Sequence, residues 1–174
     1  MLREDQEFAS IESACGLAEE VIRTFGVVRL RVFGTSMAPA ILPGDLVSIE
    51  RASLNEISTG DVVLFQQRGR FFVHRVVDCK RAAAAGTHEE ACLITRGDRL
   101  RNDDPPVNSS ELLGRVVSLE RNHRKVEIPG RDSNRWIARL LRASDRLTYL
   151  YVRFFVSLSD DRRSFFLGRA KCQS

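Results

Sequence analysis

The sequence predicts a mainly β domain of short, mostly antiparallel strands, flanked by an N-terminal and a C-terminal amphipathic helix, so that the chain is α+β overall. Three observations support this prediction. Short apolar runs typical of strands recur between residues 27 and 130. Turn signals rich in glycine, proline and asparagine separate these runs. Residues 5–25 and the stretch from about 132 to 158 have apolar residues at helical spacing instead.

Size and composition limit the possible classes of protein. A chain of 174 residues is about one domain and can bury a real core. No window reaches the roughly 18 to 20 uninterrupted apolar residues of a membrane span. The acidic N-terminus has no apolar stretch behind it, so it does not resemble a signal peptide. We therefore expect a cytoplasmic or peripherally membrane-associated chain.

The cysteines give no sign of a metal site or a disulfide framework. All four are scattered, without a C-x-x-C pair, which favours free thiols in a reducing compartment. We expect no metal and no other cofactor. The cysteines are Cys15, Cys79, Cys92 and Cys172.

Residues 1–26 are predicted to form an N-terminal segment with an amphipathic helix over 5–25. Its apolar residues recur every three or four positions, and Gly26 is a natural stop. The segment is too short for a helix-turn-helix domain and too charged for a membrane anchor, so we expect no nucleic-acid partner. The apolar positions are Phe8, Ile11, Cys15, Ala18, Ile22 and Phe25.

Residues 27–130 are predicted to form the β domain. Each candidate strand is followed by a turn signal such as Pro43-Gly44-Asp45, Thr59-Gly60-Asp61 or Arg96-Gly97-Asp98. Several short strands at this spacing indicate a compact antiparallel or mixed sheet. The candidate strands are 27–33, 45–50, 61–66, 70–78, 91–96, 113–120 and 124–128.

Residues 131–174 form a basic C-terminal segment, in which 10 Lys and Arg stand against 4 Asp and Glu. We expect one helix that starts after Asp132 or Ser133 and continues to about Leu158. Its apolar and arginine positions fall on separate stripes. Such a helix can lie on an anionic membrane, or it can dock on the β domain or on a partner and expose its arginines to water.

The loop from Gly34 to Asp45 joins two predicted strands and contains Ser36. Gly34 frees the backbone before the serine, and Pro39 and Pro43 stiffen the loop after it. A hydroxyl presented at such a bend is a candidate nucleophile. A lone serine in such a loop more often caps its own backbone, so the functional interpretation needs partners elsewhere in the chain.

Two further stretches supply such partners. His74 lies in an alternating strand and shares a face with Phe72 and Val76. An imidazole is the side chain best suited to accept a serine proton near neutral pH. Residues 93–107 form a strand that runs into an acidic loop able to orient the imidazole. The acidic residues of this loop are Asp98, Asp103 and Asp104.

Taken in order, these blocks resemble the type I signal peptidase family, in particular its endoplasmic-reticulum, archaeal and sporulation-type branch. His74 decides the branch, because the bacterial housekeeping enzymes and the LexA-like autoproteases have a lysine there. The resemblance covers roughly residues 27–120 and implies a LexA/signal-peptidase-like β domain. The blocks are Gly34-Thr35-Ser36-Met37-Ala38-Pro39, Pro43-Gly44-Asp45, Gly60-Asp61-Val62-Val63-Leu64-Phe65, Val73-His74-Arg75-Val76 and Thr95-Arg96-Gly97-Asp98, followed by Asp103-Asp104.

The resemblance implies roles for individual residues. Ser36 matches the nucleophile and His74 the general base. Both Asp98 and Asp104 match acidic positions of the family, and we favour Asp104 as the carboxylate that supports His74. Asp98 is expected to brace its loop by accepting backbone N–H bonds, and Asp103 is a weaker alternative for the supporting role.

The function implied is that of a serine endopeptidase that cleaves a precursor protein or peptide after small residues, through an acyl-enzyme. Two departures from the family favour an alternative, a catalytically impaired binding module of the same fold. Gly34 stands where the family usually has a hydroxyl donor for the oxyanion, and the family's membrane anchor is missing. A LexA-like self-cleaving regulator would need a DNA-binding domain and a lysine base. The oligomeric state stays open.

Overall fold

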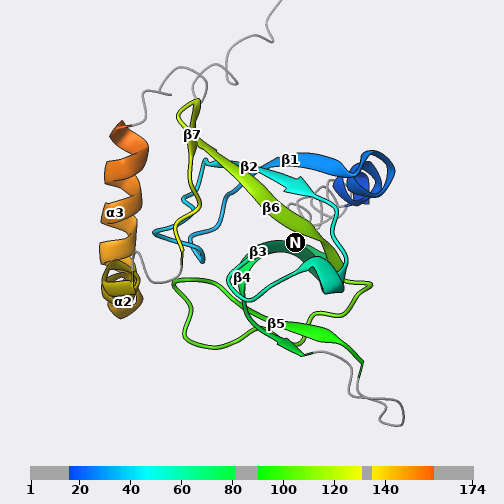
Figure 1. The fold of residues 1–174 in the computed structure, drawn as a ribbon. Coiled ribbons are helices and arrows are strands. Elements are labelled where there is room, and N and C mark those ends of the chain that lie inside the picture. The colour runs from blue at the N-terminus through cyan, green and yellow to red at the C-terminus, as the bar shows by residue number, and fades with distance from the viewer. Residues whose placement is uncertain (1–15, 81–89, 131–134, 159–174) are drawn as a thin grey trace, which may run out of the picture.

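The computed structural model describes residues 16–80, 90–130 and 135–158, and its main feature is one seven-stranded sheet (Figure 1). The strand order is β1-β2-β6-β3-β4-β5, with β7 paired to β6, and every pair is antiparallel. The predicted fold class is therefore confirmed. The strands are β1 (Val27–Arg31), β2 (Leu46–Glu50), β3 (Val62–Gln67), β4 (Arg70–Lys80), β5 (Cys92–Arg96), β6 (Leu112–Arg121) and β7 (Arg124–Val126).

Each predicted strand has an observed counterpart whose ends agree to within two residues. Glycines in the left-handed region explain why the turn signals are reliable here. Gly44 and Gly60 have φ of 96° and 100°, backbone conformations that side chains with a Cβ rarely adopt. Between β3 and β4, Gly69 has a φ of 71° in the hairpin turn.

The two faces of the sheet bury two apolar clusters. On one face Phe72 packs beside Val76 and Phe65, whereas on the other Phe71 and Val73 pack against a cluster that contains Leu64. This division matches the alternation expected along β4. His74 is buried, so its imidazole is fixed by the packing of the sheet.

The N-terminal helix is described from residue 16 to residue 25, and the earlier part of the predicted helix lies outside the described residues. Ile22 is fully buried in the same cluster as Val28. Gly26, with a φ of 74°, ends the helix, and its N–H donates to the Ile22 carbonyl at 3.0 Å.

The C-terminal segment contains two helices, α2 (Arg135–Ala143) and α3 (Asp145–Leu158), so the prediction of one continuous helix is wrong. Ser144 separates them, and its Oγ accepts a bond from the Leu147 N–H at 3.4 Å. Asp145 follows in the first turn of α3, where a carboxylate favours a helix start. The Thr148 hydroxyl donates to the Leu141 carbonyl of α2 at 2.9 Å, so a hydrogen bond connects the two helices across the break.

The inner face of these two helices packs on the loop that carries Ser36. Leu141 forms a buried cluster with Ala38 and Leu42, and Tyr151 packs against it. Burial raises the pKa of the Tyr151 phenol, and the charge of Arg121 opposes this shift more weakly. Docking on the β domain is thus confirmed for one face of the segment.

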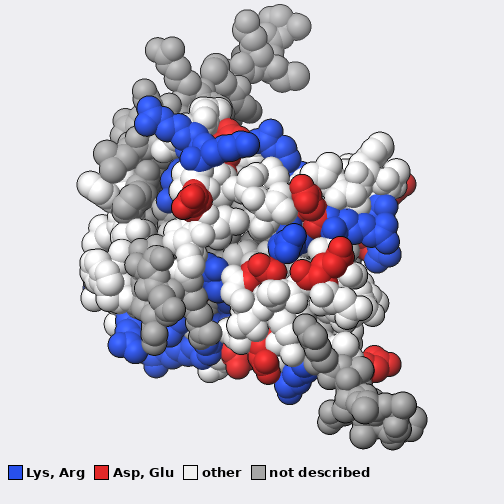
Figure 2. Space-filling view, in the orientation of Figure 1, with Lys and Arg blue, Asp and Glu red and all other residues white. Residues whose placement is uncertain are grey.

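The outer side of the two helices is rich in basic residues. Figure 2 shows Lys and Arg side chains gathered at the end of the molecule where α2 lies. Arg139 and Arg146 are both exposed. None of the helices in the described ranges has the length and apolar character needed to cross a membrane.

Gly114 allows β6 to approach β2 closely, and this contact gives a test of the fold. A Cβ at Gly114 would collide with the carbonyl oxygen of Glu50 and lie 3.0 Å from Cγ2 of Ile49. Gly114→Ala should therefore lower the free energy of unfolding by about 1–3 kcal/mol, measured by urea denaturation. Gly16→Ala is the control, because a Cβ there meets nothing within 4 Å. Equal urea midpoints for G114A and the wild type would contradict this packing.

Candidate active site

Ser36, His74 and Asp104 lie in one hydrogen-bonded chain. The Ser36 Oγ is 2.9 Å from Nε2 of His74, and Nδ1 of the same ring is 2.7 Å from Oδ2 of Asp104. The three side chains come from the loop after β1, from β4 and from the loop after β5. With its proton on Nδ1, the imidazole can accept the serine proton at Nε2, as a general base requires.

Aromatic packing holds the imidazole in this position. The His74 ring lies edge-on to Phe65, with centroids 6.0 Å apart, and tilted against Phe72 at 5.8 Å. His74 is only 3% exposed, so its ring nitrogens depend on the protein for hydrogen bonds. Rotation of the ring would break both bonds at once.

Thr95 orients the carboxylate of Asp104. Its hydroxyl donates to Oδ2 of Asp104 at 2.7 Å, and its carbonyl accepts the Asp104 N–H at 2.8 Å. Thr95 is fully buried. The sequence alone indicates no role for Thr95, because its contact with Asp104 depends on burial in the folded protein.

The other two acidic candidates do not contact His74. Asp98 binds the guanidinium of Arg75 through both oxygens, each at 2.9 Å. Asp103 pairs with Arg96 at 3.1 Å, and its side chain is half exposed. Asp98 therefore braces its loop through a guanidinium rather than through the expected backbone N–H groups. The reason is the buried charge of Arg75, which needs a carboxylate partner.

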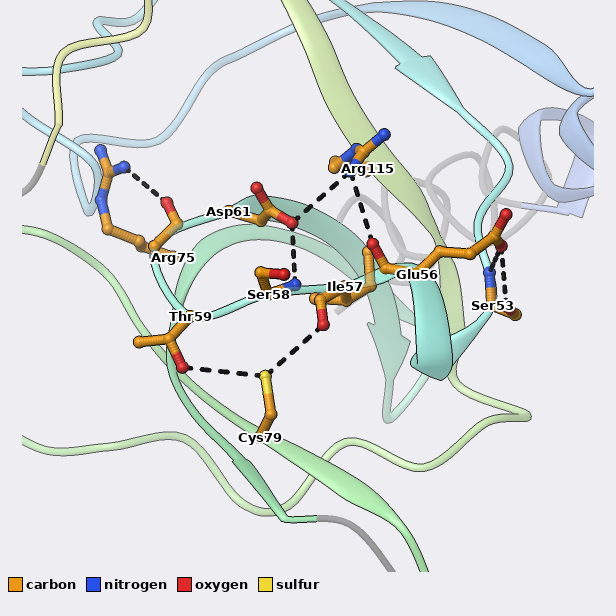
Figure 3. A network of polar contacts seen from close by, with 10 residues as sticks. Ser53, Glu56, Ile57, Ser58, Thr59, Asp61, Arg75, Cys79 and Arg115 are labelled. Carbon is orange, nitrogen blue, oxygen red and sulfur yellow. Dashed lines mark hydrogen bonds and ion pairs between the residues drawn. The ribbon is translucent and has the colours of Figure 1, made fainter.

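Arg75 joins three segments around the site. Its guanidinium also donates to the carbonyls of Gly60 and Pro129, both at 2.9 Å. Figure 3 shows Arg75 pointing at the first of these, in the connection between β2 and β3. Asp61, in the same connection, pairs with Arg115 of β6 at 3.7 Å. The strand that carries His74 is thus bonded to its surroundings directly beside the imidazole.

The connection also contains a short 3-10 turn, Leu54–Glu56, that closes on Ser53 (Figure 3). The Ser53 N–H and hydroxyl both donate to the Glu56 carboxylate at 2.7 Å. The backbone bond from Ser53, followed by the hydroxyl bond, holds the pKa of Glu56 below its ordinary value. Because the folded pKa is depressed, this contribution to stability is lost as the pH falls through it.

A buried ion pair fixes the end of the Ser36 loop. Asp45, only 3% exposed, binds Nε and Nη2 of Arg121 at 2.9 and 2.7 Å. The same carboxylate accepts the Leu42 N–H at 2.8 Å, and Arg121 donates to the Ala40 carbonyl at 3.1 Å. Sequence reasoning missed Arg121, because nothing near it in the chain connects it to the loop.

The turn after β5 packs directly on Ser36. The Arg99 N–H donates to the Ser36 carbonyl at 2.8 Å. A Cβ at Gly97 would lie 2.8 Å from that oxygen, so only glycine allows this approach. Arg142 of α2 donates to the carbonyls of Arg99 and Asp98 at 3.1 and 2.7 Å. Helix α2 therefore supports the turn after β5, and this turn supports Ser36.

One candidate hydrogen-bond donor for an oxyanion lies beside the Ser36 hydroxyl, and a second nearby position, residue 34, lacks a donor. Within the described residues, the Ser36 N–H forms no hydrogen bond, so it is available to an oxyanion. A Cβ at Gly34 would have the Ser36 Oγ as its nearest neighbour, at 4.0 Å. Position 34 therefore faces the hydroxyl but presents no donor of its own.

In the described ranges, no three His, Cys, Asp or Glu side chains form a group that could hold a metal ion.

Comparison with known protein families agrees with the geometry of the candidate site. The model of the family described as Peptidase S24-like matches residues 4–84, a stretch that contains both Ser36 and His74. The match supports the superfamily of LexA-like and signal-peptidase-like peptidases, and it suggests a serine peptidase. A search of the curated proteins found no match.

The environments of the three acidic residues predict different effects on stability. Asp98→Ala should lower the free energy of unfolding by about 3–5 kcal/mol, because it leaves the Arg75 charge buried and unpaired. Asp104→Ala should cost about 1–3 kcal/mol, the range for leaving buried hydrogen-bonding groups unsatisfied. Asp103→Ala is the exposed control and should stay within about 0.5 kcal/mol.

Urea denaturation of the three variants measures these differences. Equal losses for D98A and D103A would contradict the assignment of Asp98 to a buried ion pair. A D104A variant less stable than D98A would contradict the order of the two effects.

Proposed function

We propose that this chain is a serine endopeptidase of signal-peptidase type, which cleaves a precursor protein or peptide after a small residue. The observation that carries the proposal is the continuous hydrogen-bonded chain from Asp104 through His74 to Ser36. Its distances are those required for a base that is oriented on one nitrogen and accepts a proton on the other. The Peptidase S24-like match is consistent with this class of enzyme.

The chemistry follows from this geometry. Nε2 of His74 takes the Ser36 proton while Oγ bonds to the scissile carbonyl carbon. The carbonyl oxygen becomes an oxyanion that the Ser36 N–H stabilises. As the tetrahedral intermediate collapses, the C–N bond breaks and the leaving amine takes the proton from the imidazolium. Water, deprotonated by His74, then hydrolyses the acyl ester and regenerates the serine.

The identity of the base supports the Ser/His branch. Among the described residues, the lysines lie away from the serine, Lys80 at the exposed end of β4 and Lys125 on β7. The nitrogen next to the Ser36 Oγ belongs to an imidazole. Asp104, oriented by Thr95, holds the tautomer that leaves this nitrogen able to accept a proton.

Substitution of the three residues tests the proposal directly. Ser36→Ala and His74→Ala should each lower kcat/KM by about 10³-fold or more, and Asp104→Ala by about 10²- to 10⁴-fold. Cleavage is measured on quenched fluorescent peptides with alanine before the scissile bond. Labelling by a fluorophosphonate, detected by intact mass, should require Ser36. Ser110→Ala, in an exposed turn, is the matched serine control.

Two results would oppose the proposal. One is a wild type as inert as S36A on a broad peptide library, both with and without lipid vesicles. The other is equal activity of the wild type and H74A, which would remove the imidazole from the mechanism.

Position 34 allows the missing oxyanion donor to be restored. A side chain there points into space beside the Ser36 hydroxyl. Gly34→Ser should raise kcat by up to about 10²-fold, since a single oxyanion donor contributes on that scale. Gly34→Ala is the control, because it adds the Cβ without the hydroxyl. A serine variant no faster than the alanine variant would contradict the prediction.

The same experiment addresses the second candidate function, a binding module of this fold with impaired catalysis. The glycine at position 34 is the observation that favours it, because no side chain at that position adds a second donor to the Ser36 N–H. Under this alternative the wild type binds peptides without cleaving them, and the Gly34→Ser variant gains cleavage. An active wild type excludes the alternative.

A further inference from the structure

Helix α3 has a second apolar face that points away from the β domain. Leu147, Leu150 and Phe154 follow one another at three- and four-residue spacing and are 40%, 60% and 62% exposed. We call these three residues the outer ridge. The inward side of α3 is different, because Thr148 is buried there and Tyr151 packs on the Ser36 loop. Docking on the β domain therefore uses only one side of the helix.

A cationic stripe runs along the outer ridge. Arg146 and Arg153 are exposed and seven residues apart, which places them on one side of α3. Arg153 donates to the Tyr149 hydroxyl at 3.2 Å, so the stripe also includes an aromatic ring with a polar tip. At 100° per residue this stripe lies directly next to the ridge.

The acidic residue of the two helices already forms an ion pair with the β domain. Asp145 is the one carboxylate in residues 135–158, where five arginines occur. It pairs with Arg99 of the β domain at 2.7 Å. The outward surface of α3 therefore combines an apolar strip with positive charge, and α3 lies at the margin of the molecule, away from the sheet (Figure 1).

We propose that the outer ridge of α3 docks on an anionic lipid surface. An amphipathic helix with aliphatic and aromatic side chains flanked by arginines is suited to the boundary between headgroups and acyl chains. The apolar strip enters the boundary, while Arg146 and Arg153 remain at the level of the lipid phosphates. The arginines supply the charge complementarity that distinguishes this surface from an ordinary apolar patch.

The position of α2 and α3 gives this docking a consequence for the candidate active site. The inner face contacts Ala38 and Leu42 of the Ser36 loop. A helix with its side chains is about 10–12 Å across, so the lipid surface would lie about one helix diameter from that loop. A peptide held at the membrane would then be within reach of the serine. The binding itself does not rest on the proposed peptidase activity.

Vesicle flotation tests the docking. The full chain with Ser36→Ala, which removes any cleavage, should bind vesicles of equal parts phosphatidylcholine and phosphatidylglycerol and not vesicles of phosphatidylcholine alone. High salt should release it, because screening weakens the contribution of the arginines. Leu150→Glu should lower the partition coefficient about tenfold or more. Arg146→Gln and Arg153→Gln should each lower it about fivefold.

Matched controls separate the ridge from general surface properties. Phe25→Glu changes an exposed apolar residue of the N-terminal helix, and Arg124→Gln changes an exposed arginine of β7; both should bind like the parent. Circular dichroism checks that each variant is folded. Equal binding by the L150E and F25E variants, or no binding to anionic vesicles at low salt, would overturn the proposal. So would a concentration-dependent dimer abolished by L150E, since the ridge would then contact a second copy.

Discussion

The arrangement around Ser36 depends on the buried ion pair between Arg75 and Asp98. Arg75 follows His74 on β4, so alternation sends the two side chains to opposite faces. The imidazole reaches Ser36, while the guanidinium fixes the turn after β5. In that turn, the Arg99 N–H donates a hydrogen bond to the Ser36 carbonyl. Two neighbouring residues of one strand therefore fix the position of Ser36, His74 directly and Arg75 through the turn after β5. Because these bonds fix the loops, the loops need no regular secondary structure of their own.

The sheet and the central part of the site could be predicted from the sequence. Strand positions follow from short alternating runs between glycine-containing turns, because these signals are local. His74 stands out as a lone imidazole in an apolar strand, and the order of the motifs connects it to Ser36 and Asp104. The Peptidase S24-like match supports the same superfamily.

The remaining features depend on contacts between distant residues. Sequence spacing cannot decide whether Asp98 or Asp104 is the carboxylate that supports His74, because both follow β5 closely. The structure separates them because Asp98 is bound by the guanidinium of Arg75 on another strand. Thr95 and Arg121 are unremarkable in sequence and gain their roles through packing. The helix break at Ser144 was missed because apolar spacing continues across it, whereas the Ser-Asp capping pair favours a new start.

The pairing of β2 with β6 has a consequence for the order in which the protein becomes functional. Asp45 is bonded to Arg121, 76 residues further along the chain, and Ser36 is 38 residues from its base. Such non-local contacts form slowly, since long loops must close first. A nascent chain cannot complete the Ser36 loop until β6 has left the ribosome. By this topology, the serine, its base and the ion pair that holds its loop come together only when the sheet is nearly complete.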